Sequence, residues 1–154
     1  IVVRLVGSEM CIRDSRHPYD TVLSCFQQAF EPNNAMSNFR SIYSSARIYD
    51  LTMNMWVVYE DKLDLKYVMS KYETLIEDFD NHISKVLSFL NLEWDQNIKN
   101  YRDTALNRGK INTPSSSQVI QPLYKSSIKK WRKYEKYFED SRIYLDKWVN
   151  YFDY

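Results

Sequence analysis

A short stretch of the sequence, residues 16–24, combines an arginine, a proline, an aspartate and a serine at the start of a predicted helix. It reads Arg-His-Pro-Tyr-Asp-Thr-Val-Leu-Ser, with Ser24 eight positions beyond Arg16. Pro18 suits a first helical turn because its missing N–H has no partner there. The free N–H groups and the dipole of that turn favour an anion, and the Arg16 guanidinium can clamp a phosphate with two hydrogen bonds. The stretch therefore indicates a phosphate site, and a surface helix start is the alternative interpretation.

The helix that this stretch begins is expected to run from Tyr19 to about Phe30. At 100° per residue, the face predicted to meet the core carries Val22, Phe26 and Ala29. The opposite, polar face carries Asp20, Ser24, Gln27 and Gln28. This spacing predicts that the Ser24 hydroxyl points away from the core and is free to contact a ligand.

Composition describes an ordered globular protein with little net charge. The 154 residues are 44% hydrophobic and 16% aromatic, which excludes a disordered chain. A formal charge of +1 gives no global attraction to nucleic acid or to an anionic membrane. The two cysteines, Cys11 and Cys25, have no disulfide framework or metal-ligand spacing, and no apolar run reaches the roughly 18 residues of a membrane span. We therefore expect a cytoplasmic protein with no metal, membrane or nucleic acid as a partner.

Residues 1–15 do not match the pattern of the rest of the chain. The sequence begins at Ile1 rather than at methionine, which suggests an N-terminally truncated fragment. Residues 7–15 resemble translated adaptor sequence, so residues 1–15 are interpreted as a leader foreign to the domain. We expect this leader to pack poorly and to be dispensable.

Hydrophobic spacing beyond the first helix predicts four more helices and a strand. The long second helix, with Ser37 as N-cap and an end near residue 60, has its core positions at Ile42, Ala46, Tyr49, Met53 and Trp56. Residues 66–69 are predicted as a strand, residues 80–91 as a helix packed on the sheet, and residues 107–118 as a long loop. Helical patterns return from Ser126, with apolar positions at Ile128, Trp131, Tyr134, Phe138, Leu145, Trp148, Val149 and Phe152. The architecture implied is one strand–helix–strand crossover with parallel pairing.

Three segments in this order resemble the C-terminal half of sulfotransferases that use 3′-phosphoadenosine-5′-phosphosulfate. The bacterial branch joined to tetratricopeptide repeats and related to tyrosylprotein sulfotransferases is the most similar. The segments are residues 16–30, 72–94 and 113–134, and the resemblance covers essentially residues 16–140. It implies that residues 16–154 form the C-terminal part of an α/β, P-loop-like sulfotransferase domain. This chain would then be a truncated, predominantly α-helical part with one or two short parallel strands.

The resemblance also implies the residues that contact the cofactor. Arg16 and Ser24 match residues that hold its 3′-phosphate, and Tyr72 matches a tyrosine beside the adenine. Ser115 matches a loop serine that donates a hydrogen bond near the phosphosulfate, and it is the candidate catalytic residue. Lys130 matches a basic residue that reaches the cofactor phosphates. Without the resemblance, Tyr72 would be a core aromatic, Ser115 a solvated loop serine and Lys130 part of a solvated helix face.

Two further positions are assessed against the same resemblance. Glu73 is expected to be a structural partner rather than a catalytic group. Gln28 stands where related enzymes can carry another basic residue, which would weaken the clamp on the 3′-phosphate.

The implied reaction transfers a sulfuryl group from this cofactor to a hydroxyl or amine of a protein tyrosine, a carbohydrate or a small molecule. Cations and donors must lie where charge develops on the leaving nucleotide, and a base must accept a proton. In the family the Gly-rich phosphosulfate loop and the base lie near the N-terminus. Here the glycines are Gly7 and Gly109, and neither element is found. We expect this fragment alone to be inactive.

Two other interpretations remain open from the residues themselves. The basic and aromatic segment 125–137 could bind nucleic acid or an acidic partner as part of a non-catalytic helical module. A purely structural helical interaction domain is the third interpretation, and it leaves the Arg16–Asp20 turn and the serine-rich loop unexplained together.

Overall fold

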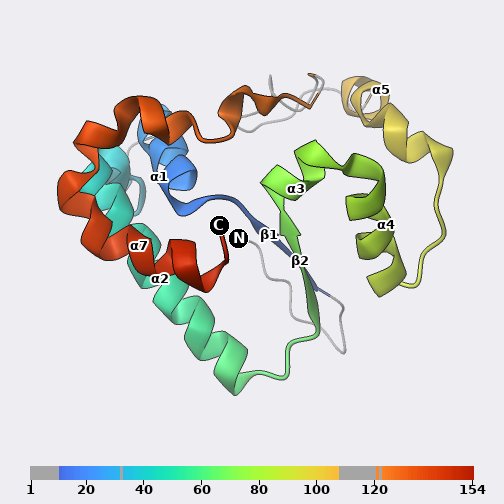
Figure 1. Ribbon diagram of the computed structural model, residues 1–154, viewed down its shortest axis with the longest axis horizontal. Coiled ribbons are helices and arrows are strands. Elements are labelled where there is room, and N and C mark those ends of the chain that lie inside the picture. Colours follow the sequence, from blue (N-terminus) through green and yellow to red (C-terminus); the bar gives the residue numbers. More distant parts are fainter. Residues whose placement is uncertain (1–10, 32, 108–120, 122) are drawn as a thin grey trace.

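A parallel pair of strands lies between two groups of helices in the computed structural model, which describes residues 11–31, 33–107, 121 and 123–154 (Figure 1). Strand β1, Cys11–Ser15, pairs with β2, Tyr67–Lys71, in a register that sets Cys11 opposite Tyr67 and Ser15 opposite Lys71. The connection between them runs through α1, Pro18–Gln27, η1, Met36–Arg40, and α2, Ile42–Lys62. The mainly helical character and the short parallel strand pair are therefore confirmed, although the first strand lies in a segment that was not predicted to contribute one. None of the described helices is long and apolar enough to cross a membrane.

Strand β1 corrects the expectation that residues 1–15 pack poorly, for the described part of that segment. Its ladder with β2 is extended by a 3.0 Å bond from the Cys11 N–H to the Lys66 carbonyl. The strand was not recognised in the sequence because an apolar side chain faces solvent and a charged one faces inward: Ile12 is 46% exposed, whereas Arg13 is partly buried. Residues 1–10 lie outside the described ranges, and whether residues 1–15 are native to the domain stays a prediction.

The inward Arg13 is accommodated by aromatic rings. Its guanidinium carbon lies 4.3 Å from the ring centre of Trp56 and 4.4 Å from that of Phe152, and Nη2 contacts the Met53 sulfur at 3.5 Å. Burial lowers the pKa of Arg13. A planar, weakly hydrated guanidinium between ring faces is favourable, so β1 is fixed to α2 and to the C-terminal helix through one side chain.

Helix α1 begins as predicted and presents a different face to the core. Pro18 lies in its first turn, and the helix ends at Gln27 rather than near Phe30. Its buried apolar residues are Tyr19, Val22 and Leu23. The predicted core positions Phe26 and Ala29 are wrong, since Phe26 is 39% exposed and Ala29 lies beyond the helix and is exposed. The core contacts α1 along the face defined by spacings of three and four from Tyr19.

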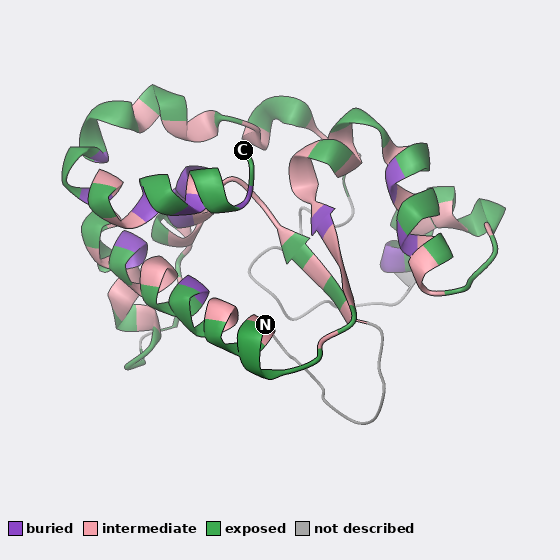
Figure 2. Cartoon of the chain, turned by 60° about the horizontal axis from the view of Figure 1, so that its bottom comes forward, coloured by how far each residue is buried: buried purple, intermediate pink, exposed green. Residues whose placement is uncertain are grey.

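The main core joins α1, α2 and the C-terminal helix α7, Arg142–Tyr151 (Figures 1 and 2). Its buried residues are Tyr19, Val22, Leu23, Ala46, Phe138 and Leu145, and a neighbouring cluster contains Met53, Trp148 and Phe152. The periodicity of α2 is confirmed, with Ala46 and Met53 buried. Its N-cap is Ser41, whose hydroxyl accepts from the Ser44 N–H at 3.0 Å, and not Ser37. The intervening residues form the 3-10 helix η1 instead.

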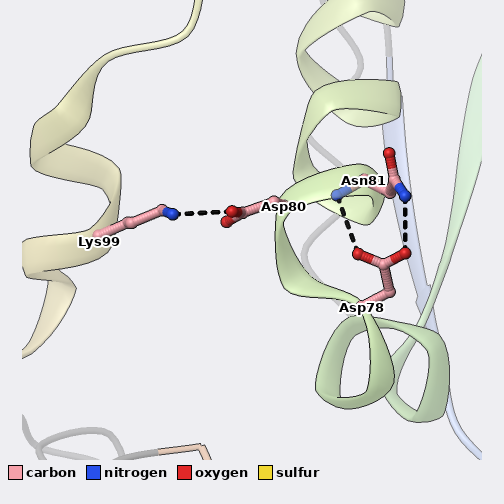
Figure 3. Close-up of polar contacts among 4 residues, drawn as sticks. All are labelled: Asp78, Asp80, Asn81 and Lys99. Atoms are coloured by element: carbon pink, nitrogen blue, oxygen red, sulfur yellow. Dashed lines mark hydrogen bonds and ion pairs between the residues drawn. The ribbon is translucent and has the colours of Figure 1, made fainter.

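A second group of helices follows β2: α3, Tyr72–Glu77, α4, Phe79–Phe89, η2, Gln96–Asn100, and α5, Tyr101–Asn107. The predicted helix 80–91 is confirmed as α4. Asp78 caps it, accepting from the Asn81 N–H at 3.3 Å and from the Asn81 side chain at 2.7 Å (Figure 3). A 2.7 Å ion pair between Lys99 and Asp80 joins η2 to the first turn of α4. His82 fastens α4 to β2 through a 3.0 Å contact with the Ser70 hydroxyl.

The C-terminal segment returns to α1 as short 3-10 helices: η3, Lys125–Ser127, η4, Lys130–Tyr137, and η5, Glu139–Ser141. The helical pattern predicted from Ser126 therefore forms separate 3-10 helices: Tyr134 interrupts η4 with a φ of −121°, and Lys129 has a left-handed φ of 56°. The expected apolar side is confirmed at Phe138, which is fully buried, and Trp131 packs beside it. The predicted loop 107–118 falls, except for its first residue, outside the described ranges, and Ser115 with it.

Candidate functional site

The candidate site lies where both strands end. β1 continues through Ser15 and Arg16 into α1, and β2 continues through Lys71 and Tyr72 into α3. Because the two strands are parallel, their carboxyl ends meet at the same edge. In open sheets of this kind that edge is the usual place for a ligand. The predicted residues Arg16 and Tyr72 each follow one strand directly, so the topology places them together.

Arg16 connects three parts of the chain at this edge. Its guanidinium lies 5.2 Å from the centre of the Tyr72 ring, and Nη2 donates a 2.7 Å hydrogen bond to the Ser127 carbonyl. Its buried Nε has no hydrogen-bond partner. The Tyr72 hydroxyl donates to the Tyr124 carbonyl at 3.2 Å, and burial raises the pKa of this tyrosine. The arrangement leaves one donor of Arg16 available beside an aromatic face.

Asp20 departs from the expectation that it lies on the solvent face of α1. It is 1% exposed, and its two oxygens accept backbone N–H bonds from Lys129 at 2.7 Å and Trp131 at 2.8 Å. The face that helical spacing alone marks as polar is therefore covered by the C-terminal segment. Buried carboxylates are stable when both oxygens are hydrogen-bonded in this way.

Ser24 and Lys130 are brought to this same side of α1. The Lys130 ammonium donates a 2.8 Å bond to the Gln27 side-chain oxygen. Ser24 lies one turn beyond Asp20 and one turn before Gln27, and it is half-buried. Burial raises the pKa of the adjacent Cys25 thiol, and the charge of Arg16 acts in the opposite direction. Ser24 therefore lies on the part of α1 that Lys130 reaches at Gln27.

Gln28 is not part of this arrangement. It is the C-cap of α1 and lines a separate surface hollow with Phe26, Phe30, Phe39 and Arg40, among others. The structure therefore gives no support to a role for Gln28 beside Arg16.

Glu73 and His17 complete the edge, and sequence reasoning gave no binding role to either. One Glu73 oxygen accepts the His17 N–H at 3.0 Å, which agrees with the structural role expected for this glutamate. The His17 ring stacks on Trp131 with ring centres 5.5 Å apart, and burial lowers the pKa of His17. In the sequence, the feature that could have pointed to His17 is its position inside the Arg-x-Pro-x-Asp turn.

Several buried polar atoms at this edge have no partner: Arg16 Nε, His17 Nδ1, Glu73 Oε2 and Trp131 Nε1. Such atoms are rare in folded proteins, and each one calls for a ligand or a water molecule. These four atoms include both donors and acceptors, and they belong to residues that follow the strands or contact one another there. Within the described ranges, no three histidine, cysteine or carboxylate side chains are grouped so that they could hold a metal ion.

The last residues of the chain cover one flank of this edge. The Tyr154 hydroxyl lies 2.7 Å from the Ser15 hydroxyl, and Lys71 donates a 2.8 Å bond to the Asp153 carbonyl. The Lys71 ammonium also lies 4.9 Å from the centre of the Tyr154 ring. Both strand ends are therefore tied to the C-terminal residues.

Comparison with known proteins gives little functional information. No protein-family model matches the chain, and no solved structure matches it. A protein of Aquifex aeolicus (strain VF5), described as uncharacterized, is 27% identical over an alignment of 147 residues, and the match covers 89% of this chain. The match covers 18% of that protein, so the chain spans less than a fifth of the length of this relative.

Proposed function

We propose that this chain supplies the nucleotide-binding part of a sulfotransferase that uses 3′-phosphoadenosine-5′-phosphosulfate. The observation that carries the proposal is the Arg16 guanidinium, which lies against Tyr72 at the carboxyl edge of the sheet with its buried Nε unpartnered. A guanidinium offers parallel N–H donors that match a phosphate. An aromatic ring beside it suits a purine.

The contacts of Arg16 and Lys130 also favour an anion. Among the described residues, neither Arg16 nor Lys130 takes part in an ion pair; the neutral acceptors that they contact are the Ser127 carbonyl and the Gln27 amide. Two cations with neutral partners can both turn toward a phosphate without breaking a salt bridge. The carboxylate of Asp20 is already occupied by two backbone N–H groups.

Each residue then has a stated part in binding the cofactor. Arg16 and Ser24 hold the 3′-phosphate, Tyr72 contacts the adenine, and Lys130 reaches the phosphates. The cofactor supplies an activated sulfuryl group for a hydroxyl or amine acceptor, and Ser115 donates a hydrogen bond as the sulfuryl group leaves. The family resemblance implies that the phosphosulfate loop, the base and any tetratricopeptide repeats are supplied by other parts of the enzyme, and the roles of Ser115 and Lys130 rest on the same resemblance.

The test is calorimetric titration of the 154-residue chain with 3′-phosphoadenosine-5′-phosphate and with AMP. We expect Arg16→Ala to weaken binding of 3′-phosphoadenosine-5′-phosphate by about 1.5–3 kcal/mol, the range for a charge-assisted hydrogen bond. Binding of AMP should be almost unaffected. Arg47→Ala, at an exposed position of α2, is the matched control. Equal weakening of both nucleotides, or of neither, would contradict the phosphate clamp.

A second candidate function rests on the exposed face of η4. Tyr137 is 58% exposed, and the Lys136 ammonium lies 4.9 Å from its ring centre, an arrangement that also suits nucleic acid or an acidic partner. This function predicts binding of single-stranded oligonucleotides that weakens steeply with salt. A Lys136→Ala/Tyr137→Ala variant should lose oligonucleotide binding. If that variant still prefers 3′-phosphoadenosine-5′-phosphate over AMP, the two binding activities belong to different surfaces.

A further inference from the structure

We infer that Asp20 is a positioning residue, which holds the segment 127–131 against α1 and thereby places the Ser127 carbonyl beside Arg16 and the Lys130 side chain along α1, at Gln27. The inference rests on the proposed function, since it takes the ligand of this edge to be a phosphate. Asp20 itself does not contact that ligand.

The geometry of Asp20 is unusual for an aspartate in a helix. Its carboxylate is almost fully buried, and both of its oxygens are occupied by backbone groups far away in the sequence. The two donors, Lys129 N–H and Trp131 N–H, flank Lys130 on either side. The backbone of Lys130 is therefore held at both of its ends by one side chain.

The segment that Asp20 holds has a backbone conformation that needs such an anchor. Lys129 adopts a φ of 56°, in the left-handed region that is unfavourable for a residue with a Cβ atom. Two residues later, the Trp131 ring stacks on Tyr19 with centres 4.4 Å apart. The anchor and the stack both come from the first turn of α1, directly after Arg16.

The consequence for the candidate site follows from the hydrogen bonds around Arg16. Ser127, which accepts the 2.7 Å bond from Arg16, lies just before the anchored residues, and Lys130 lies between them. Release of the two N–H groups from Asp20 would free both the acceptor that orients Arg16 and the second cation. Asparagine cannot replace Asp20 fully, because its single oxygen can accept one of these bonds while its amide group opposes the other donor.

The experiment compares Asp20→Asn with Asp140→Asn, an exposed aspartate of η5, in the 154-residue chain. Hydrogen exchange reports the amides of Lys129 and Trp131, and titration reports the ratio of affinities for 3′-phosphoadenosine-5′-phosphate and AMP. We expect Asp20→Asn to speed exchange at both amides at least about tenfold and to reduce the affinity ratio about fivefold or more. The α2 amides and the Asp140→Asn control should not change.

A double-mutant cycle with Lys130→Met separates positioning from general stability. If Asp20 acts through Lys130, Asp20→Asn reduces the affinity ratio less in the Lys130→Met background than in the natural chain. The inference would be overturned if Asp20→Asn reduced the affinity ratio by the same factor in both backgrounds. It would also be overturned if Asp20→Asn weakened binding of both nucleotides equally. If Asp20→Asn does not fold, the Lys130→Met variant alone tests the inference. An unchanged ratio of affinities for the two nucleotides in Lys130→Met would show that the anchored segment does not contribute to phosphate binding.

The same titrations distinguish this failure from failure of the proposed function. A natural chain that binds both nucleotides equally contradicts the phosphate site as a whole. A natural chain that prefers the bisphosphate, with the preference intact in Asp20→Asn, contradicts the role of Asp20 alone.

Discussion

Both histidines of the sequence are held in surroundings that favour their neutral form. His82 is 6% exposed, and its ring contacts the Ser70 hydroxyl at 3.0 Å. Burial lowers its pKa, and Lys85 adds to the effect. His17 is packed between aromatic rings, and burial lowers its pKa as well. His82 joins α4 to β2, and the His17 ring packs against Tyr19, Trp131 and Tyr154, so the protonation of each histidine affects the packing of a different part of the fold.

This environment predicts that the free energy of unfolding falls between pH 7.5 and 5.5. Below the ordinary histidine pKa of 6.5, the unfolded chain takes up protons that the folded chain does not accept until lower pH, so acid favours unfolding. Urea denaturation across this range measures the loss. A His82→Gln variant should be less stable at pH 7.5 and should lose less on acidification. Equal stability of the natural chain at both pH values would show that neither histidine is held neutral.

Strand β1 is expected to contribute to the stability of the fold. Comparison of a chain lacking residues 1–10 with one lacking residues 1–15 isolates its contribution. We expect the longer deletion to lower the free energy of unfolding by about 2–4 kcal/mol relative to the shorter, because ladder hydrogen bonds and the stacked Arg13 are lost. Chemical denaturation with a Trp fluorescence readout measures the difference, and equal stability would restore the interpretation of residues 11–15 as dispensable.

The elements that sequence reasoning located correctly are those with strong local patterns. Helices α2 and α4 follow from apolar stripes with helical period, and β2 from a short run rich in aromatic and β-branched residues. The charged strand β1 was missed because Arg13 is stabilised by Trp56 and Phe152, from distant parts of the chain. For the candidate site, the Arg-x-Pro-x-Asp turn and the family resemblance both indicated Arg16, and the resemblance alone indicated Tyr72. The buried state of Asp20 has no local signature, since its partners lie more than 100 residues away.

At the level of the whole molecule, we expect this chain to bind nucleotide without transferring a sulfuryl group. The family resemblance places the phosphosulfate loop and the base in a part of the parent that this sequence does not contain. A coupled assay with 3′-phosphoadenosine-5′-phosphosulfate and phenolic, carbohydrate and amine acceptors measures turnover. The parent protein should be active and lose activity in Arg16→Ala. Cofactor-dependent sulfation by the 154-residue chain alone would refute the expectation.

The residues of the main core are synthesised at widely separated times. Tyr19, Val22 and Leu23 of α1 pack against Phe138 and Leu145, which are synthesised more than 100 residues later. Translation proceeds from the N-terminus at roughly 5–20 residues per second, so α1 waits several seconds for these partners. During that time α1 can pack against α2, which follows it directly, but not against these two residues. A ribosome that stalls before Phe138 therefore releases a product in which α1 lacks its contacts with Phe138 and Leu145.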